Sequence, residues 1–393
     1  MSGPTLVPST DAHFAWLLGE AESPDGLRIP PGGVDAPWVL KWLRRTLPKL
    51  GGYGGWLMVA DGEVVGLCGY KWPPSQAGDV EIGYGVAPER RRLGYARQGT
   101  ALILEAARQD PRVRAVTAET ALANQPSQRV LQANGFFQVG RNTDDDEGET
   151  IVWRLPLRPA LAADLPPELL AQRLDALYQT SGGRIVRTNE WDGRPAPRFH
   201  LMLTTDGPTI RFGQGVPADV ARRLEALASR ETWDPSAEGP PPSLDRYVEV
   251  LAAHAPIERI WSGPAFAAPR DMVPFAPVLD INAANAGLLR GRFDDWLPDA
   301  PHRQPFVAVV RDASAVSICA SVRISPSVHC AGVETHPDHR RRGHALAAVS
   351  GWAHGVQALS ATPFYSTSWA NQASRRVAAR LGFQLAAHDL HIT

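Results

Sequence analysis

The sequence is poor in cysteine, in uncompensated charge and in long apolar stretches. Its three cysteines, Cys68, Cys319 and Cys330, lie in apolar runs, which favours reduced thiols over a disulfide framework. Lysine plus arginine (40) nearly equals aspartate plus glutamate (41), so there is no electrostatic basis for nucleic-acid binding or a polybasic membrane anchor. No apolar run approaches the ~18 residues of a membrane helix, and the first residues lack a secretion-signal pattern. These absences predict a cytoplasmic protein that binds neither nucleic acid nor membrane.

What the chain does contain is an internal repeat. Residues 91–96 (RRLGYA) recur 249 positions later as residues 340–345 (RRRGHA). Downstream of each, an Asn-x-x-Ser sequence followed by Gly-Phe begins at Asn124 and recurs 247 positions later at Asn371. Two motifs in the same order at nearly the same offset indicate two copies of one domain, too far apart for a solenoid repeat.

The hydrophobic pattern predicts the same order of elements in both copies. In the first, residues 56–71 predict a hairpin around Asp61-Gly62, residues 79–86 a strand that runs into the arginine-rich turn, and residues from about 95 a helix. A strand, a short helix and a final hairpin follow. The second copy repeats this order from residue 306 onward. Strands that alternate with helices predict an α/β fold with a mixed sheet and an antiparallel start.

Between the copies lies a stretch that belongs to neither. Residues 157–167 are rich in proline and alanine and predict a linker. We therefore predict an N-terminal domain at 1–157, a small α/β module at 165–265 associated with the C-terminal half, and a C-terminal domain at 268–393.

The arginine-rich turn suits a pyrophosphate. A turn of the form Arg-x-x-Gly-x-Ala that opens a helix presents successive backbone N–H groups, and the helix start adds partial positive charge. Glycine allows close approach of the backbone, and the arginines add full charge. One such hexamer is a weak signal because many helices begin with basic residues. Two copies, each followed by Asn-x-x-Ser and Gly-Phe, are a much stronger one.

At residues 81–96 and 124–136 the sequence resembles the GNAT superfamily of acetyl-CoA-dependent N-acetyltransferases. The resemblance covers about residues 5–155 and again about 270–393. The first copy looks most like the branch that contains ribosomal-protein-alanine acetyltransferases. The second, with residues 332–337 and 365–371, resembles another GNAT branch, with which the 165–265 module is associated. The resemblance implies two GNAT-type domains in tandem, with acetyl-CoA and an amine as binding partners.

The resemblance also implies roles for matching positions. The turn would hold the pyrophosphate through backbone N–H groups, the strand before it would pair with the pantetheine arm, and the helix asparagine would bond the cofactor. The implied cofactor-binding residues are Val86, Arg91, Arg92, Leu93, Gly94, Tyr95, Ala96 and Asn124 in the first copy and Thr335, Arg340, Arg341, Arg342, Gly343, His344, Ala345 and Asn371 in the second. No Cys/His spacing indicates a metal site.

Acetyl transfer to an amine requires a neutral nucleophile, so an ammonium group must first lose a proton to a base. Glu81 lies ten residues before Arg91 in the strand that leads to the turn, and it matches the superfamily's common base position. The alternative is a surface strand glutamate paired with an arginine. A backbone N–H near the strand end, around Tyr84, would hold the oxyanion.

The two copies differ where the chemistry is expected. Cys330 stands opposite Glu81, and a thiol is a poor substitute for a carboxylate base; its alternative role is a small buried strand residue. Glu334 and His336 are nearby and could serve instead, although a histidine before proline is also an ordinary turn residue.

The general acid is open in both copies. Many GNAT members carry a tyrosine seven residues after the helix asparagine, as proton donor to the leaving thiolate. Here those positions are Leu131 and Ala378. Ser127, Ser374 or a water are substitutes, and both serines are equally ordinary at the start of a helix.

We therefore predict a tandem GNAT N-acetyltransferase that transfers an acetyl group to a primary amine, either a small molecule or a protein N-terminus, with Glu81 as base. Its candidate catalytic residues are Glu81, Tyr84, Ser127 and Glu334. The alternative is an acyl-CoA sensor or scaffold with little or no turnover. Tandem copies could also pair as a pseudo-dimer within one chain.

Overall fold

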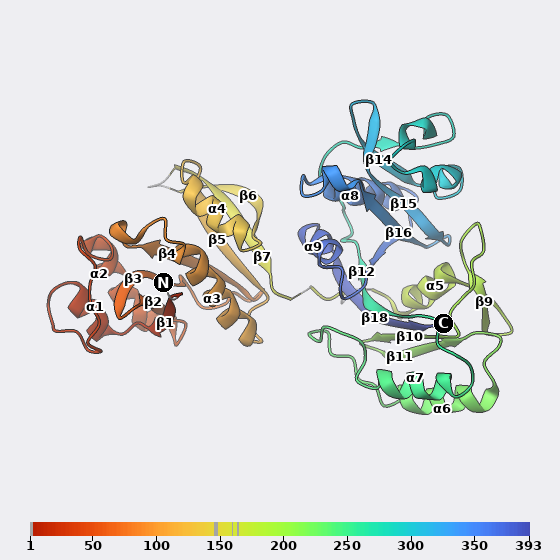
Figure 1. Cartoon of the computed structure of the whole chain (residues 1–393), viewed down its shortest axis with the longest axis horizontal. Helices are drawn as coiled ribbons and strands as arrows, with labels where there is room; N and C mark the ends of the chain where they lie inside the picture. The colour runs from red at the N-terminus through yellow and green to blue at the C-terminus, as the bar shows by residue number, and fades with distance from the viewer. Residues whose placement is uncertain (1–2, 145–147, 159, 163–164) are drawn as a thin grey trace. The chain divides into compact units, whose positions relative to one another are not determined.

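A computed structural model describes residues 3–144, 148–158, 160–162 and 165–393 of the chain (Figure 1). It divides into two compact units, Met1–Arg158 (unit 1) and Pro159–Thr393 (unit 2). Both are built on mixed sheets, as predicted. Among the residues described, no helix has the length and apolar character needed to cross a membrane.

Unit 1 is a seven-stranded sheet with helices on both faces. Its strands lie in the order β1-β2-β3-β4-β5-β7-β6, and only the β4–β5 pair is parallel. The strands are β1 (Thr5–Pro8), β2 (Gly55–Ala60), β3 (Glu63–Tyr70), β4 (Asp79–Val86), β5 (Ala115–Ala121), β6 (Phe137–Asp144) and β7 (Gly148–Pro156). The helices are α1 (Asp11–Leu17), α2 (Pro37–Thr46), α3 (Tyr95–Gln109) and α4 (Gln125–Ala133), with short 3₁₀ turns η1 (Leu47–Leu50) and η2 (Pro88–Arg90).

Side-chain alternation along the strands gives this sheet two separate cores. Val80 and Ile82 of β4 pack with Ile103 of α3 on one face. On the other face, Leu57 of β2 packs with Leu40 of α2. The odd-numbered positions of β4 therefore face the side of α1 and α2, and the even-numbered ones face α3 and α4.

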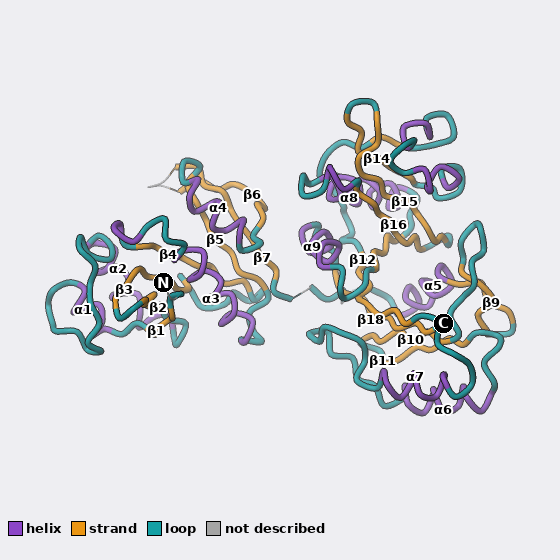
Figure 2. The backbone as a smooth tube through the Cα atoms, in the orientation of Figure 1, coloured by secondary structure: helices purple, strands orange, loops and turns teal. Residues whose placement is uncertain are grey.

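Unit 2 contains a nine-stranded sheet (Figure 2), in the order β11-β10-β18-β12-β17-β16-β15-β14-β13. These strands are β10 (Phe199–Thr204), β11 (Gly207–Phe212), β12 (Ile260–Ala267), β13 (Leu279–Asp280), β14 (Phe306–Arg311), β15 (Ser314–Ile324), β16 (Val328–Thr335), β17 (Thr362–Ser366) and β18 (Gln384–Ile392), while β8 (Tyr178–Ser181) and β9 (Arg184–Thr188) form a separate hairpin. The helices are α5 (Pro167–Leu177), α6 (Ala218–Ala228), α7 (Leu244–Ala252), α8 (His344–Ala358) and α9 (Gln372–Arg380), with 3₁₀ turns η3 (Ala286–Leu289), η4 (Asp294–Asp299) and η5 (Pro337–His339).

The residues between the two sequence copies are part of this large sheet. Strands β10 and β11 extend it beyond β18, and β12 lies between β18 and β17. Strand β5 of unit 1 corresponds to β17 of unit 2. The neighbour of β5 at this place is β7, which comes later in the chain than β5. Unit 2 fills that place with β12, which comes earlier than β17. The boundary predicted between 265 and 268 thus falls at the end of β12, and the three-part division stays a prediction.

A buried ion pair joins α5 to this sheet. Nη1 of Arg173 donates to Oδ1 of Asp389 at 3.2 Å, and the two residues are only 1% and 3% exposed. Nη2 of Arg173 also donates to Oγ of Ser366, and Nε2 of His200 lies 3.3 Å from Oδ1 of Asp389. Burial by itself raises the pKa of Asp389, but the Arg173 charge and the bonds from His200 and Arg173 outweigh it and hold that pKa well below its usual range.

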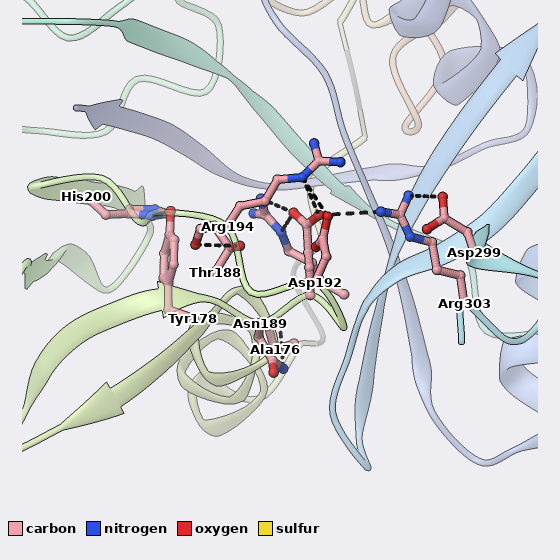
Figure 3. A network of polar contacts seen from close by, with 11 residues as sticks. Ala176, Tyr178, Thr188, Asn189, Asp192, Arg194, His200, Asp299 and Arg303 are labelled. Carbon is pink, nitrogen blue, oxygen red and sulfur yellow. Dashed lines mark hydrogen bonds and ion pairs between the residues drawn. The ribbon is translucent and has the colours of Figure 1, made fainter. Parts of the chain in front are cut away.

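A second polar network ties the segment after β9 to the loop before β14 (Figure 3). Glu190 pairs with Arg323 at 2.9 Å and with Arg303 at 3.5 Å, and Arg303 also pairs with Asp299 at 3.1 Å. Nε1 of Trp191 donates to Oδ1 of Asp299 at 2.6 Å. These contacts hold residues 190–191 against the sheet of the C-terminal copy.

Candidate active site

Strand β4 loses one of its two neighbours halfway along. It pairs with β5 only over Asp79–Glu81, while its pairing with β3 continues to Val86. N–H of Lys71 donates to the Glu81 carbonyl and N–H of Ala87 to the Val65 carbonyl, so the odd-numbered backbone groups point to β3. Backbone groups of successive residues point to opposite sides of a strand, so the N–H and C=O groups of Tyr84 and Val86 point to the side where β5 no longer pairs with β4.

The arginine-rich turn follows directly and has the same backbone geometry in both units. In unit 1, φ is +63° at Arg92 and +86° at Gly94, the residue before α3; in unit 2 it is +60° at Arg341 and +81° at Gly343. Left-handed residues in a turn direct successive N–H groups into one concavity, and the first N–H groups of a helix have no intrahelical acceptor. This geometry suits an anion, and pyrophosphate binding at the two turns stays a prediction.

The first arginine of each turn anchors it to the preceding strand. Nε of Arg91 donates to the carbonyl of Val86, and Nε of Arg340 donates to the carbonyl of Thr335, both at 3.3 Å. The remaining implied cofactor positions lie in the turns or in the first residues of α3 and α8: Arg92, Leu93, Gly94, Tyr95 and Ala96, and Arg341, Arg342, Gly343, His344 and Ala345. Their roles in cofactor binding stay predictions.

Unit 2 repeats the open strand. Its β16 pairs with β17 only over Val328–Cys330 and then continues beside β15 alone as far as Thr335. In each unit, the strand before the turn thus has a stretch of backbone edge without a neighbouring strand.

The two helix asparagines act as N-caps. Oδ1 of Asn124 accepts from N–H of Ser127 at 3.2 Å, and Oδ1 of Asn371 accepts from N–H of Ser374 at 3.1 Å. An N-cap oxygen satisfies one of the free donors at the start of a helix. The observed role is local; a further bond to a cofactor stays a prediction.

A cavity of about 200 Å³ opens on the α1–α2 side of the unit 1 sheet. Its floor includes Gly83 and Gly85, the odd-numbered positions of β4 where no side chain covers the backbone. Its walls are largely apolar and include Phe14, Val39, Trp42, Leu43, Leu47, Leu50, Trp56, Leu67 and Tyr70. The cavity reaches the same stretch of β4 whose other edge has lost β5.

Glu81 is not among the residues that line this cavity, but its ion-pair partner Lys71 is. Glu81 is on the same face of β4 as Gly83, and Nζ of Lys71, which lines the cavity, is 2.6 Å from Oε1 of Glu81. The alternative considered for Glu81 is a strand glutamate paired with an arginine. The structure shows such an ion pair, with a lysine in place of the arginine. Lys71 itself gave no sequence signal, because its pairing depends on the register of β3 against β4.

Tyr84 points to the opposite face and reaches α4. Its hydroxyl donates to the backbone carbonyl of Ser127 at 3.2 Å, so the structure brings these two predicted residues together. Burial raises the pKa of Tyr84 to about 12, so its hydroxyl keeps its proton at neutral pH. Leu131, at the position where many relatives carry tyrosine, is fully buried in the core.

In unit 2, the position that corresponds to Glu81 is covered. Cys330, opposite Glu81, is packed with Leu170, Leu174 and Leu177 of α5. Burial raises the pKa of its thiol, which therefore stays neutral. Glu334 is exposed, and its Oε2 accepts from Nε1 of Trp296 at 2.8 Å.

One carboxylate of the cavity was not anticipated from the sequence. Asp35, directly before α2, lines the cavity, but no motif marks it. Within the described ranges, the structure places no group of three or more His, Cys, Asp or Glu side chains that could hold a metal ion.

Two family models match the chain, one over each sequence copy. A family model described as an acetyltransferase (GNAT) domain matches residues 5–137, and one described as a GNAT acetyltransferase matches residues 306–388. No curated protein matches the chain.

Solved structures similar to the chain include an acetyltransferase of the GNAT family from Bacillus anthracis, with 16% identity, coverage of 40% of this chain and 96% of that one, and a TM-score of 0.31. Another is AAC(6')-Ib in complex with ribostamycin and coenzyme A, with 18% identity, coverage of 39% and 94%, and a TM-score of 0.32. A third is RimL, a ribosomal α-N-protein acetyltransferase in complex with coenzyme A, with 14% identity, coverage of 40% and 95%, and a TM-score of 0.32.

Proposed function

We propose that this chain, which carries two GNAT acetyltransferase domains, transfers an acetyl group from acetyl-CoA to a primary amine in unit 1. The observation that carries the proposal is that β4 is accessible from two directions, from one face of the sheet and from one strand edge. The cavity reaches β4 from one face at Gly83 and Gly85, and the departure of β5 leaves the backbone of Tyr84 free at the edge. An acceptor in the cavity and an acyl group along the strand edge would be in contact there. Three buried free cysteines support the cytoplasm as its site of action.

The residues of unit 1 fit acetyl-CoA. The turn at 91–96 offers backbone N–H groups and two guanidinium groups for its pyrophosphate. The N–H and C=O groups of Tyr84 and the N–H of Val86 suit an amide-containing arm, whereas the Val86 carbonyl already accepts from Arg91. When bound, acetyl-CoA supplies an acyl group on a thioester. Asn124, which caps α4, is a candidate contact for acetyl-CoA.

Glu81 is the proposed general base. An acceptor amine over Gly83 lies beside the Glu81 carboxylate and can transfer its proton there, directly or through water. The ion pair with Lys71, which lines the cavity, fixes the position of the carboxylate. A backbone N–H of the open strand edge would hold the oxyanion of the tetrahedral intermediate.

Tyr84 is the proposed proton donor to the leaving thiolate. It is the hydroxyl that the described residues place between β4 and α4, and its raised pKa keeps the proton available at neutral pH. Ser127 contributes its carbonyl, which orients the phenol, and its own hydroxyl is the second candidate.

Unit 2 supports a different role, the binding of acyl-CoA without turnover. Its turn and open strand match those of unit 1, but a neutral thiol under α5 replaces the base. Glu334 is the remaining candidate for catalysis in this unit.

The test is release of free thiol from acetyl-CoA with a panel of primary amines. Glu81→Gln should lower turnover by ~10²-fold or more and leave the affinity for CoA unchanged, because a general base contributes about 10²- to 10⁴-fold. Asp79→Asn is the matched control, since Asp79 lies on the same face of β4 and is also ion-paired, with Arg154 at 2.8 Å.

Two outcomes would contradict this assignment. Activity of Glu81→Gln within a few-fold of wild type at neutral pH removes Glu81 as base. Tight binding of CoA with no thiol release for any amine favours the sensor or scaffold alternative.

A further inference from the structure

We propose that Asp35 recognises a second cationic group on the acceptor, so that the substrates of unit 1 are diamines whose two nitrogens are separated by an apolar spacer. The inference rests on the proposed acetyl transfer in unit 1 and specifies the class of amine. It comes from the position of Asp35 in the cavity and from the balance of charge around it.

Asp35 is held over the bare stretch of β4. Its Oδ1 accepts from N–H of Ala36 at 2.7 Å, at the start of α2, which fixes the carboxylate group. A Cβ atom built on Gly85 would lie 3.2 Å from Oδ2 of Asp35, so this oxygen faces the strand directly. The absence of a side chain at Gly85 is therefore what leaves room for the carboxylate.

The charges of the cavity do not cancel. Its lining contains two charged side chains, Asp35 and Lys71. Lys71 is paired with Glu81, whereas Oδ2 of Asp35 has no donor or cation among the described residues. The three groups together carry a net charge of −1. A diamine that binds with its reacting amine already neutral and its second amine as ammonium carries +1, which balances this charge while Glu81 is ionised.

The Lys71–Glu81 pair and Asp35 lie at different points along β4, so the reacting amine and the second cationic group would bind at different places. The Cε atom of Lys71 lies 3.7 Å from the Cβ position of Gly83, so the Lys71–Glu81 pair marks the end of the cavity where the reacting amine belongs. Asp35 marks Gly85, two residues farther along the strand. Two residues of strand span about 7 Å, which is the separation of the nitrogens in a diamine with a chain of about five carbons.

The walls between these two ends suit a methylene spacer. The side chains of Trp42, Trp56, Leu43 and Leu47 line the cavity and offer no charge. A cavity of about 150 Å³ holds a benzene ring, so about 200 Å³ is sufficient for a short aliphatic diamine. Polar recognition at one end and apolar contact along the chain are typical of small-ligand sites.

The experiment compares 1,5-diaminopentane with 1-aminopentane, which lacks only the second amine. In the wild type we expect the diamine to have the higher kcat/KM. Asp35→Asn, in which the amide oxygen can still accept from Ala36, should raise KM for the diamine by about 10- to 100-fold with kcat little changed, since a charge-assisted hydrogen bond is lost. The parameters for the monoamine should not change, so the preference for the diamine should disappear.

The matched control is Glu105→Gln, because Glu105 is exposed on α3, on the other face of the sheet. Calorimetric binding of 1,5-diaminopentane to wild type and Asp35→Asn in the presence of CoA gives a second readout that does not need turnover.

The outcomes separate the two proposals. Thiol release with neither amine, together with diamine binding that Asp35→Asn weakens, would refute the acetyl transfer and leave the Asp35 site standing. Acetylation of both amines with equal kcat/KM, or equal loss of both in Asp35→Asn, would overturn the role of Asp35 and leave the acetyl transfer intact. Absence of diamine binding to the wild type would also overturn it.

Discussion

Removal of the Asp389 carboxylate would leave Arg173 as an unpaired cation in the interior of unit 2. Arg173 is 1% exposed, and its polar partners among the described residues are Asp389, the Ser366 hydroxyl and the sulfur of Met202. Breaking a buried ion pair by deleting one partner costs about 3–5 kcal/mol, because the remaining charge is not solvated. We therefore expect Asp389→Ala to lower the free energy of unfolding of unit 2 by that amount.

The size of the unit converts this energy into a melting shift. At ~2.1 cal/mol/K per residue, the 235 residues of 159–393 have an unfolding entropy of about 0.5 kcal/mol/K. A loss of 3–5 kcal/mol then lowers Tm by about 6–10 °C. Differential scanning calorimetry of the full chain measures it, and Leu57→Ala, in the core of unit 1, identifies the transition of that unit by moving it alone.

A second variant tests the cause. In Arg173→Met with Asp389→Ala, no buried charge remains, so most of the lost Tm should return although one more contact is gone. A shift below about 2 °C in Asp389→Ala, or a double variant as unstable as the sum of the single ones, would refute the reasoning that an uncompensated charge is the source of the instability.

Other perturbations address the turns and the acid sensitivity of unit 2. Gly94→Ala and Gly343→Ala each place a side chain at a positive φ, +86° and +81° respectively, which costs about 1–2 kcal/mol of strain. Calorimetric titration of either variant with acetyl-CoA should then show one site per chain in place of two. Unchanged stoichiometry in both variants would contradict the anion-site assignment. Burial lowers the pKa of His388 to about 4 and that of His391 to about 3. Because the unfolded chain binds these protons near pH 6.5, the stability of unit 2 should fall as pH decreases from 6.5 toward 4, by up to ~1.4 kcal/mol per pH unit for each histidine. A Tm of unit 2 that stays constant from pH 6.5 to 4.5 would contradict this account.

The repeated turn shows what a few consecutive residues are enough to predict. The motif at 91–96 and 340–345 predicts a turn before a helix, and both copies have left-handed torsions at equivalent positions, Arg92 with Gly94 and Arg341 with Gly343. Turn geometry depends on a few consecutive residues, so it can be read from them.

The cavity and its charges depend on contacts between distant segments. Asp35 and Gly85 are fifty positions apart in the chain, and only the packing of α2 on the sheet places the carboxylate over the strand. The pairing of Lys71 with Glu81 requires the register of β3 against β4. A register cannot be derived from either strand alone.

Sequence alone determined the duplication, the strand–turn–helix units and the GNAT identity of both copies, because these reside in short motifs and in periodic patterns of apolar residues. Tertiary structure decided that β12 inserts between β17 and β18, that α5 covers Cys330, and that the two copies therefore present different sites on similar strands. The physical reason is that strand order and burial arise from long-range pairing, in which each segment's place depends on the free energy of the whole sheet.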